Sequence, residues 1–241
     1  MNVLVVGAGE MGTWFGSCLD ADLAYADTDP AAAERAAETT GGRAVALDAE
    51  ERFDAVCLAV PMSAIAEAVA VHAGRAERAV VDLAGVMRPA VAAMREHAPD
   101  RERLSLHPLF AASAAPGRVA VVADEPGEAT DRIRADLAAA GNDLFETTPE
   151  EHDRAMRTVQ AQAHAAVLAY GLAREGIDER FHTPVSRRLA DLVERVTDGT
   201  PRVYSEIQAT FGGADAVAEA AERVAGADDD AFEALYREAS R

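Results

Sequence analysis

Three glycines near the start of the chain have the spacing of a phosphate-binding turn. Gly7, Gly9 and Gly12 follow a short apolar segment at GxGxxG spacing and lead into a helix-like segment that begins with Glu10 and Met11. The first glycine permits a tight turn, the second leaves room for a pyrophosphate, and the third lets the helix pack closely on the strand. Free N–H groups at the helix start would face the phosphate charge. The pattern predicts a dinucleotide site, with an ordinary glycine turn in a βαβ unit as the alternative.

Two further residues fit the same cofactor. Asp27 ends the apolar segment 23–26 and lies 20 residues after Gly7, where a carboxylate accepts hydrogen bonds from the adenosine ribose. That carboxylate would repel a 2′-phosphate, and the sequence places no arginine beside it, so we expect NAD rather than NADP. Pro61 ends the apolar segment 53–60, at a position where the carboxyl ends of parallel strands meet the cofactor.

His107 is the candidate catalytic residue. It follows the apolar segment 104–106 and precedes a proline, so we expect it at the carboxyl edge of a sheet, where the nicotinamide would lie. A neutral imidazole there could accept a proton from a substrate hydroxyl while hydride leaves the same carbon. The alternative is a loop histidine that bonds to backbone.

A second polar set lies in a helical segment from residue 150 onward. Glu150, Glu151 and Asp153 suit the first turn of a helix through its dipole, which is a sufficient structural reason for all three. Gln160 and His164 are four residues apart and share one face among alanine, valine and methionine. Such a pair indicates either a buried hydrogen bond between subunits or a contact with substrate.

A third set consists of arginines on an expected helix at 184–198. Arg188 and Arg195 flank the apolar stripe of this helix on one side, and Arg187 points further round. A guanidinium beside an apolar stripe can bind a carboxylate through two hydrogen bonds. Solvated counter-charges in an acidic protein are the alternative.

The elements that must position these residues fall into two halves. Apolar segments alternate with helical patterns in the first half, which predicts a Rossmann-type, doubly wound, mainly parallel α/β sheet. The expected strands are 3–6, 23–26, 43–47, 53–60, 79–83, 104–106, 119–123 and 144–146. Only helical patterns follow, at about 150–175, 184–198, 200–211, 214–225 and 229–239. We therefore expect an NAD-binding domain at 1–146 and an all-helical substrate and dimerisation domain at 147–241. A helical half this short would struggle to bury its apolar stripes alone, so we expect a homodimer through these helices.

Composition narrows the function classes. The net charge is −19, from 42 acidic and 23 basic residues, and every base is arginine. The absence of lysine excludes Schiff-base, P-loop and lysine-acid mechanisms. The acidic surface disfavours nucleic acid and anionic membranes, and it suits a halophilic protein, because molar salt screens charges within roughly 3 Å. Cys18 and Cys57 lack metal-type spacing, so no metal is expected. We expect a cytoplasmic protein, since neither a signal peptide nor a membrane span is apparent.

The chain resembles the prephenate dehydrogenases, oxidoreductases of tyrosine biosynthesis, in a monofunctional, haloarchaeal-like form. Six segments carry the resemblance: VVGAGEMGTWF at 5–15, LAVPMSAIAEAV at 58–69, VVDLAGVM at 80–87, SLHPLFAAS at 105–113, EEHDRAMRTVQAQAH at 150–164 and PVSRRLADLVERVTDGTPRVYSEIQ at 184–208. The His-Pro-Leu-Phe and His-Asp…Val-Gln…His segments are far more specific than the glycine pattern, which many dehydrogenases share.

The resemblance implies NAD-dependent oxidative decarboxylation of prephenate to 4-hydroxyphenylpyruvate. It implies that His107 is the catalytic histidine and that Gln160 and His164 line the prephenate site. It also implies that Arg187 and Arg195 are binding arginines, with Arg195 on the substrate carboxylate. The alternatives are an arogenate dehydrogenase, a deazaflavin-dependent NADP reductase, which Asp27 disfavours, and a non-catalytic NAD-binding regulatory module.

The chain departs from the family pattern beside the catalytic histidine. The family often has Asp-Leu-Ala-Ser-Val-Lys where this chain has Asp82-Leu83-Ala84-Gly85-Val86-Met87, so a serine hydroxyl that can assist the histidine is missing. Ala111-Ala112 also replaces the usual glycine-proline pair. Ser113 or a water molecule is expected to substitute for the missing hydroxyl.

Overall fold

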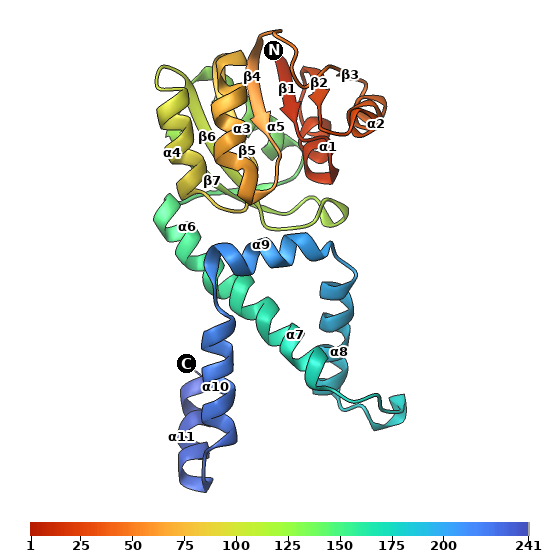
Figure 1. Ribbon diagram of the computed structural model, residues 1–241, viewed down its shortest axis with the longest axis vertical. Helices are drawn as coiled ribbons and strands as arrows, with labels where there is room; N and C mark the ends of the chain where they lie inside the picture. The colour runs from red at the N-terminus through yellow and green to blue at the C-terminus, as the bar shows by residue number, and fades with distance from the viewer. Residues whose placement is uncertain (241) are drawn as a thin grey trace. The chain divides into compact units, whose positions relative to one another are not determined.

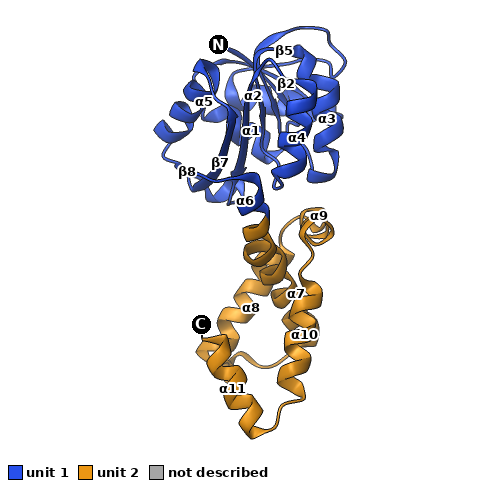
Figure 2. Ribbon diagram, turned by 90° about the vertical axis from the view of Figure 1, so that its left-hand side faces the viewer, with its two compact units in different colours: residues 1–153 blue, residues 154–241 orange. Residues whose placement is uncertain are grey.

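The computed structural model of the protein describes residues 1–240, which form two compact units. Unit 1 spans residues 1–153, and unit 2 begins at Arg154 (Figure 2). The division falls within one helix, α6 (Pro149–Met156).

Unit 1 is built on one eight-stranded sheet with the strand order β3-β2-β1-β4-β5-β6-β7-β8 (Figure 1). Its strands are β1 (Asn2–Val6), β2 (Asp22–Ala26), β3 (Arg43–Ala44), β4 (Phe53–Leu58), β5 (Ala76–Asp82), β6 (Glu102–Pro108), β7 (Arg118–Glu125) and β8 (Asp143–Glu146). All neighbours are parallel except β6 and β7. The strand order reverses direction at β1, which is where ligands bind in open α/β sheets. The expected Rossmann-type, mainly parallel sheet is confirmed.

Helices cover both faces of this sheet. They are α1 (Glu10–Ser17), α2 (Pro30–Thr40), α3 (Ile65–His72), α4 (Arg88–His97) and α5 (Glu128–Ala139). Val5, Val81 and Leu106 share a buried cluster with residues of α1, α2 and α5. The alternate strand residues, such as Leu4 and Val80, are buried on the opposite face, which α3 and α4 cover (Figure 1). Each such side chain stabilises the fold by roughly 1.5–3 kcal/mol.

The sequence explains where α2 begins and ends. The Asp29 carboxylate accepts a hydrogen bond from the Ala31 N–H at 3.1 Å, and Pro30 occupies the first turn, where its missing N–H costs nothing. The helix stops at Gly41, whose φ of 76° favours glycine.

Several strand boundaries differ from the expected ones by one to three residues. The strand expected at 43–47 is only two residues long, Arg43–Ala44. The strand expected at 104–106 runs from Glu102 to Pro108, because β7 lies antiparallel to it and pairs His107 with Ala120. His107 therefore lies within β6, near its carboxyl end, and not after the strand.

Unit 2 is helical, as expected. Its helices are α6, continued by a π-helical turn η4 (Arg157–Gln162), then α7 (Ala163–Ala173), α8 (Pro184–Thr197), α9 (Pro201–Phe211), α10 (Ala214–Ala225) and α11 (Asp229–Ala239). The single helix expected at 150–175 is thus interrupted by a π turn, which sequence periodicity does not reveal. Thr183 caps α8, where its side chain accepts a hydrogen bond from the Ser186 N–H at 3.2 Å.

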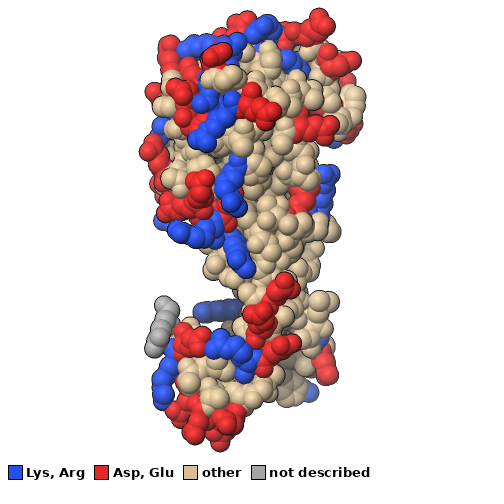
Figure 3. Space-filling model, turned by 60° about the vertical axis from the view of Figure 1, so that its left-hand side comes forward, with Lys and Arg blue, Asp and Glu red and all other residues tan. Residues whose placement is uncertain are grey.

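Unit 2 buries little of its apolar surface. Helices α7, α10 and α11 contain no buried residue. Large apolar side chains stand in solvent instead: Val159, Leu172, Ile177, Phe181, Val185, Leu192, Val203, Val224, Phe232 and Tyr236. Acidic and arginine side chains are interspersed on the face of the molecule seen in Figure 3. Within residues 1–240, no helix has the length and apolar character needed to cross a membrane.

Candidate active site

The glycine turn has the shape that a dinucleotide requires. Gly7 has a φ of 97°, and a Cβ there would overlap the Ala59 carbonyl oxygen, so both its conformation and its packing favour glycine. A Cβ on Gly12 would overlap the Gly7 carbonyl oxygen. A Cβ on Gly9 would meet no atom within 4 Å, so this side of the turn is open. The N-terminus of α1 opens onto that space, and these residues fit a pyrophosphate.

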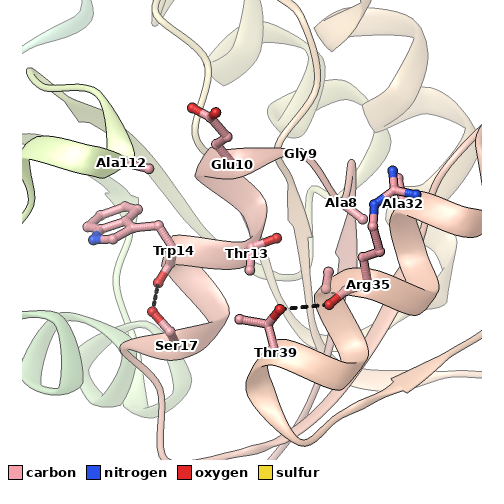
Figure 4. A pocket seen from close by; sticks show the side chains of 11 residues that line it. Ala8, Gly9, Glu10, Thr13, Trp14, Ser17, Ala32, Arg35, Thr39 and Ala112 are labelled. Atoms are coloured by element: carbon pink, nitrogen blue, oxygen red, sulfur yellow. Dashed lines mark hydrogen bonds between the residues drawn. The ribbon is translucent and has the colours of Figure 1, made fainter.

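A pocket of about 580 Å³ adjoins the turn. Figure 4 shows Thr13 and Trp14 on its α1 side and Arg35 and Thr39 on its α2 side. Ala8, Gly9, Glu10, Ser17, Ala32, Ala36 and Ala112 complete the lining. Trp14 packs edge-on against Phe110, with ring centroids 5.2 Å apart.

Asp27 is tied to the glycine turn. Its Oδ2 accepts a hydrogen bond from the Ala8 N–H at 2.7 Å, and its Oδ1 accepts one from the Asp29 N–H at 2.9 Å. The sequence interpretation found no arginine beside this carboxylate. The structure places Arg35, which pairs with Asp29 at 3.4 Å, in the pocket next to the turn. Sequence reasoning missed this arginine because α2 folds back over β2.

Several candidate residues share the carboxyl edge of the sheet. Strands β1, β4, β5 and β6 are parallel neighbours, so their carboxyl ends lie side by side. Gly7 follows β1, Pro61 lies after β4, Gly85 lies after β5, and His107 is near the end of β6. The edge therefore brings the glycine turn, Pro61 and the candidate catalytic histidine to one side of the sheet.

His107 is held by a second histidine that the sequence reasoning did not single out. The His107 side chain is buried, and its Nδ1 lies 2.8 Å from Nε2 of His152 on α6. The other ring nitrogen of His152, Nδ1, lies 2.9 Å from Oδ1 of Asp153. Asp153 also accepts hydrogen bonds from the Met87 N–H at 2.9 Å and the Arg88 N–H at 3.2 Å, and it pairs with the Arg88 side chain at 3.1 Å. Asp153 thus has a specific partner set beyond the helix dipole.

The local environment sets the charges of this cluster. Burial lowers the pKa of His107 to about 3, with a further contribution from His152 and an opposing one from Asp153, so the ring is neutral near pH 7. Burial tends to raise the pKa of Asp153, but hydrogen bonds from His152, Met87 and Arg88 outweigh it, and the pKa lies below its ordinary value. The result is a neutral imidazole linked to a carboxylate through a second imidazole.

Gly85 faces the remaining nitrogen of His107. A Cβ on Gly85 would lie 3.4 Å from His107 Nε2 and 3.1 Å from the Met62 sulfur. The residue at which the family serine is missing is therefore in contact range of the catalytic candidate. Among the described residues, the side chain bonded to His107 is His152, and Ser113 is exposed and does not take that place.

Asp82 is a second buried carboxyl group at this edge. It ends β5, pairs in register with Ser105 on β6, and accepts a hydrogen bond from the Ala84 N–H at 2.9 Å. Its Oδ2 has no hydrogen-bond partner among the described residues. Burial raises the pKa of Asp82 to about 7 and the Asp153 charge adds to the rise, whereas Ser105 and Ala84 oppose it.

In unit 2, Gln160 and His164 lie on the π turn and on α7. The Gln160 Oε1 and the His164 Nδ1 are buried without a hydrogen-bond partner among residues 1–240. Burial lowers the pKa of His164. Two residues of α9, which sequence reasoning did not assign to the site, join them. Tyr204 packs edge-on against His164 with centroids 4.9 Å apart, and Gln208 Nε2 donates to the Ala161 carbonyl at 2.7 Å. π turns often occur at functional sites.

The two candidate arginines of α8 lie apart from each other. Arg187 lines a pocket of about 480 Å³ with Arg188 and Asp191, and its guanidinium lies 3.7 Å from the Glu179 carboxylate. Arg195 is exposed in the last turn and has no ion pair among the described residues. Eight residues separate the two, which is about 12 Å along a helix.

The sequence of the chain is similar to those of known dehydrogenases. No family model matches the chain. The chain is 33% identical over 268 residues to the 4-amino-4-deoxyprephenate dehydrogenase of Streptomyces pristinaespiralis, covering 98% of this chain and 88% of that protein. It is 24% identical over 178 residues to a probable arogenate/prephenate dehydrogenase of Methanocaldococcus jannaschii, covering 67% of this chain and 40% of that protein.

Solved structures share the fold. Prephenate dehydrogenase from Aquifex aeolicus, in complex with hydroxyphenyl propionate and NAD⁺, superposes with a TM-score of 0.72 at 17% identity, covering 100% of this chain and 92% of that one. Arogenate dehydrogenase from Synechocystis gives a TM-score of 0.65 at 16% identity, covering 100% and 98%. The extent of the match to the Streptomyces protein shows that the chain belongs to the prephenate/arogenate dehydrogenase family of oxidoreductases.

Proposed function

We propose that the protein catalyses the NAD-dependent oxidative decarboxylation of prephenate to 4-hydroxyphenylpyruvate, a step of tyrosine biosynthesis. The observation that carries this proposal is the buried, neutral His107 at the same sheet edge as an open glycine turn. Its Nδ1 is occupied by His152, so its Nε2 is the nitrogen available to a substrate. Family membership supports the reaction class.

The mechanism needs one base and accurate placement. Bound NAD would accept the hydride. His107 Nε2 accepts the proton of the ring hydroxyl as hydride leaves the same carbon, carbon dioxide departs, and the phenolate oxygen of the aromatic product takes the proton back. A positioned base contributes about 10²–10⁴-fold to such a step. Placement of the reactants supplies up to roughly 7–11 kcal/mol of the barrier.

The cofactor residues of this proposal are Gly7, Gly9, Glu10, Met11, Gly12, Asp27 and Pro61. The open face at Gly9 supports a pyrophosphate at the start of α1. Asp27 favours NAD, because its carboxylate would bond ribose hydroxyls and repel a 2′-phosphate. Arg35 could neutralise part of that repulsion, so rates with NAD and NADP have to be compared directly.

The substrate residues of this proposal are Gln160, His164, Arg187 and Arg195. The unpartnered Gln160 Oε1 and His164 Nδ1 support a polar ligand beside them, since buried polar atoms normally have partners. Arg195, which has no ion pair among the described residues, suits the side-chain carboxylate of prephenate. Arg187 is a weaker candidate because it faces Glu179.

A second candidate substrate is 4-amino-4-deoxyprephenate, which carries an amine in place of the ring hydroxyl. One observation favours it: the Streptomyces relative, which is 33% identical to this chain, bears that name. Arogenate, with an amino acid side chain on the prephenate ring, is a third.

One experiment separates these functions. NADH absorbance is followed in molar salt with prephenate, arogenate or 4-amino-4-deoxyprephenate as the sole substrate, each with NAD and with NADP. The proposal predicts the highest kcat/KM with prephenate and NAD. A preference for the amine substrate would identify the second candidate, and no turnover of any of them would support a non-catalytic NAD-binding module.

The proposal has two further parts. The exposed apolar side chains of unit 2 support a homodimer, and the net charge of the whole chain supports a halophilic protein. Helix α7 is apolar yet has no buried residue, and Leu172 on it is 90% exposed. A second copy would cover such a helix. In molar salt, the repulsion within a chain of net charge −19 would be screened. Sedimentation in 0.2 and 3 M salt tests both, and a monomer at every salt concentration would contradict the dimer.

A further inference from the structure

We propose that His152 and Asp153 form a proton relay with His107: they fix His107 with its proton on Nδ1, and His152 receives that proton when His107 Nε2 accepts one from the substrate. This inference rests on the proposed dehydrogenase function for the second step, but its first step concerns the resting protein alone. His152 and Asp153 are positioning residues here, because they act through His107.

The hydrogen-bond chain fixes the protonation states from one end. The Asp153 carboxylate only accepts, and it receives the Met87 N–H, the Arg88 N–H and the Arg88 side chain. His152 Nδ1, 2.9 Å from Asp153 Oδ1, must therefore carry a hydrogen. The proposal takes His152 as neutral in the resting protein, so that its Nε2 carries a lone pair to which His107 Nδ1, 2.8 Å away, donates.

This leaves the lone pair of His107 on Nε2. That nitrogen lies beside Gly85, which has no side-chain N–H or O–H group to bond it. The lone pair is therefore free to accept a proton from a ligand. In the family pattern a serine hydroxyl can stand at position 85, whereas this chain sets the histidine from the opposite nitrogen.

The relay also answers an electrostatic difficulty. A full positive charge on the buried His107 is costly, as its lowered pKa indicates. If the Nδ1 hydrogen moves to His152 Nε2 as Nε2 of His107 gains a hydrogen, His107 stays neutral. The positive charge then lies on His152, whose Nδ1–H is bonded to the ionised Asp153. The reverse transfers return the proton to the phenolate oxygen, so no proton is gained or lost in the cycle.

Other ionisable groups bracket this relay. Asp82 on β5 interacts with Asp153, and Arg88 at the start of α4 pairs with it. These groups affect the relay mainly through Asp153. Outside the relay, the Asp153 carboxylate is stabilised by the Met87 and Arg88 N–H groups and by the Arg88 side chain.

The first test reads the protonation of His107 without substrate. Two-bond ¹H–¹⁵N spectra of the ¹⁵N-histidine-labelled protein distinguish the two neutral forms of each ring, and loss of a resonance set in His107→Asn assigns it. In the wild-type protein we expect His107 as the Nδ1–H form. In His152→Leu the leucine offers no acceptor for that hydrogen, so we expect His107 to convert to the Nε2–H form. His107 as the Nε2–H form in the wild-type protein would overturn the inference.

Two substitutions separate orientation from proton transfer. In His152→Gln the amide oxygen can still accept the His107 Nδ1–H, but it cannot take the proton. We expect this variant to keep the Nδ1–H form and to lose about 10-fold in kcat, and His152→Leu to lose about 100-fold, with KM changed less than threefold in both. A wild-type kcat in His152→Gln would overturn the transfer step.

Controls keep these results interpretable. His97→Gln, on the far end of α4, should leave both the His107 spectrum and kcat unchanged. Circular dichroism checks that His152→Leu is folded, and the wild-type spectrum and His152→Gln decide the matter if it is not. If the wild-type protein turned over none of the three ring substrates, the proposed function would fail, while the spectra would still test the fixed form of His107.

Discussion

Histidines of the two units differ in their hydrogen bonding: His107 and His152 of unit 1 have partners, whereas His164 Nδ1 of unit 2 has none among the described residues. In unit 1, His107 is hydrogen-bonded to His152 at 2.8 Å, and His152 is hydrogen-bonded to Asp153 at 2.9 Å. In unit 2, the His164 Nδ1 and the Gln160 Oε1 are buried with no partner among the described residues. Unit 1 therefore orients His107, the candidate base, from within one chain. Under the proposed function, a bound substrate would supply partners for these two atoms of unit 2.

The apolar residues show the same contrast. The sheet of unit 1 is covered on both faces, and Val5, Val81 and Leu106 are fully buried. Helix α7 of unit 2 buries none of its residues. A substitution of a buried residue in unit 1 should therefore change catalysis or folding. A substitution in unit 2 should change substrate binding or assembly. Substitutions in each unit test that division.

The largest effect is expected for His107→Asn. Loss of the base should lower kcat by about 10²–10⁴-fold with KM changed little, because the interaction it removes is made in the transition state. Steady-state kinetics with NAD and prephenate measure both constants. A near-normal kcat would show that unit 1 does not hold the base.

The buried carboxyl of Asp82 should make the stability of unit 1 depend on pH. Its pKa is raised from 3.8 to about 7, so the folded protein holds a proton that the unfolded chain releases. This destabilising contribution is absent below about pH 4, grows as pH rises, and is complete above about pH 7, where it reaches at most about 4 kcal/mol. Asp82→Asn should remove it, so the free energy of unfolding of the variant should exceed that of the wild type at pH 8 more than at pH 5. Denaturant titrations in constant molar salt measure the difference, and an equal gain at both pH values would contradict the assignment.

Arg195→Gln should weaken substrate binding more than it slows the chemical step. Loss of a charge-assisted hydrogen bond of about 1.5–3 kcal/mol predicts a rise in KM for prephenate of roughly 10–100-fold, with kcat changed less. Arg188→Gln on the same helix is the matched control and should leave KM within about twofold. If the control had the larger effect, the carboxylate would bind at the Arg187 and Arg188 pocket instead.

The smallest effect is expected for Gln160→Leu. Its Oε1 has no partner to lose, so the free energy of unfolding should change by less than about 1 kcal/mol, while KM for prephenate rises about 3–10-fold. Gln162→Leu, in the same π turn, is the matched control. Equal KM values for the two variants would remove Gln160 from the substrate site.

The sequence predicted the features of this molecule that depend on local pattern. The GxGxxG spacing, the alternation of apolar strands with helices, and the position of Asp27 follow from short-range geometry, and the sheet and its strand types are as expected. The glycine turn needs Gly7 and Gly12 for the steric reasons inferred from their spacing.

The features that were missed depend on contacts between distant segments. Asp153 had a sufficient local explanation in the helix dipole, so its bond to His152, and the contact of His152 with a histidine 45 residues away, could not be inferred from spacing. Arg35 reaches the pocket beside the glycine turn only because α2 folds back on β2. The π turn at 157–162 follows the same side-chain pattern as an ordinary helix. For the contact between His107 and His152, the adjacent His152-Asp153 pair at the start of a helix was the signal that the sequence offered.

The most direct test of the central claim is a crystal structure of the protein with NAD and hydroxyphenyl propionate, the ligand pair of the Aquifex aeolicus structure. The decisive quantity is the distance from His107 Nε2 to the ligand hydroxyl oxygen. We predict a hydrogen bond of about 2.6–3.2 Å, with the His107 Nδ1 still bonded to His152. A ligand hydroxyl beyond the reach of His107, in every subunit and with the nicotinamide in place, would contradict the account.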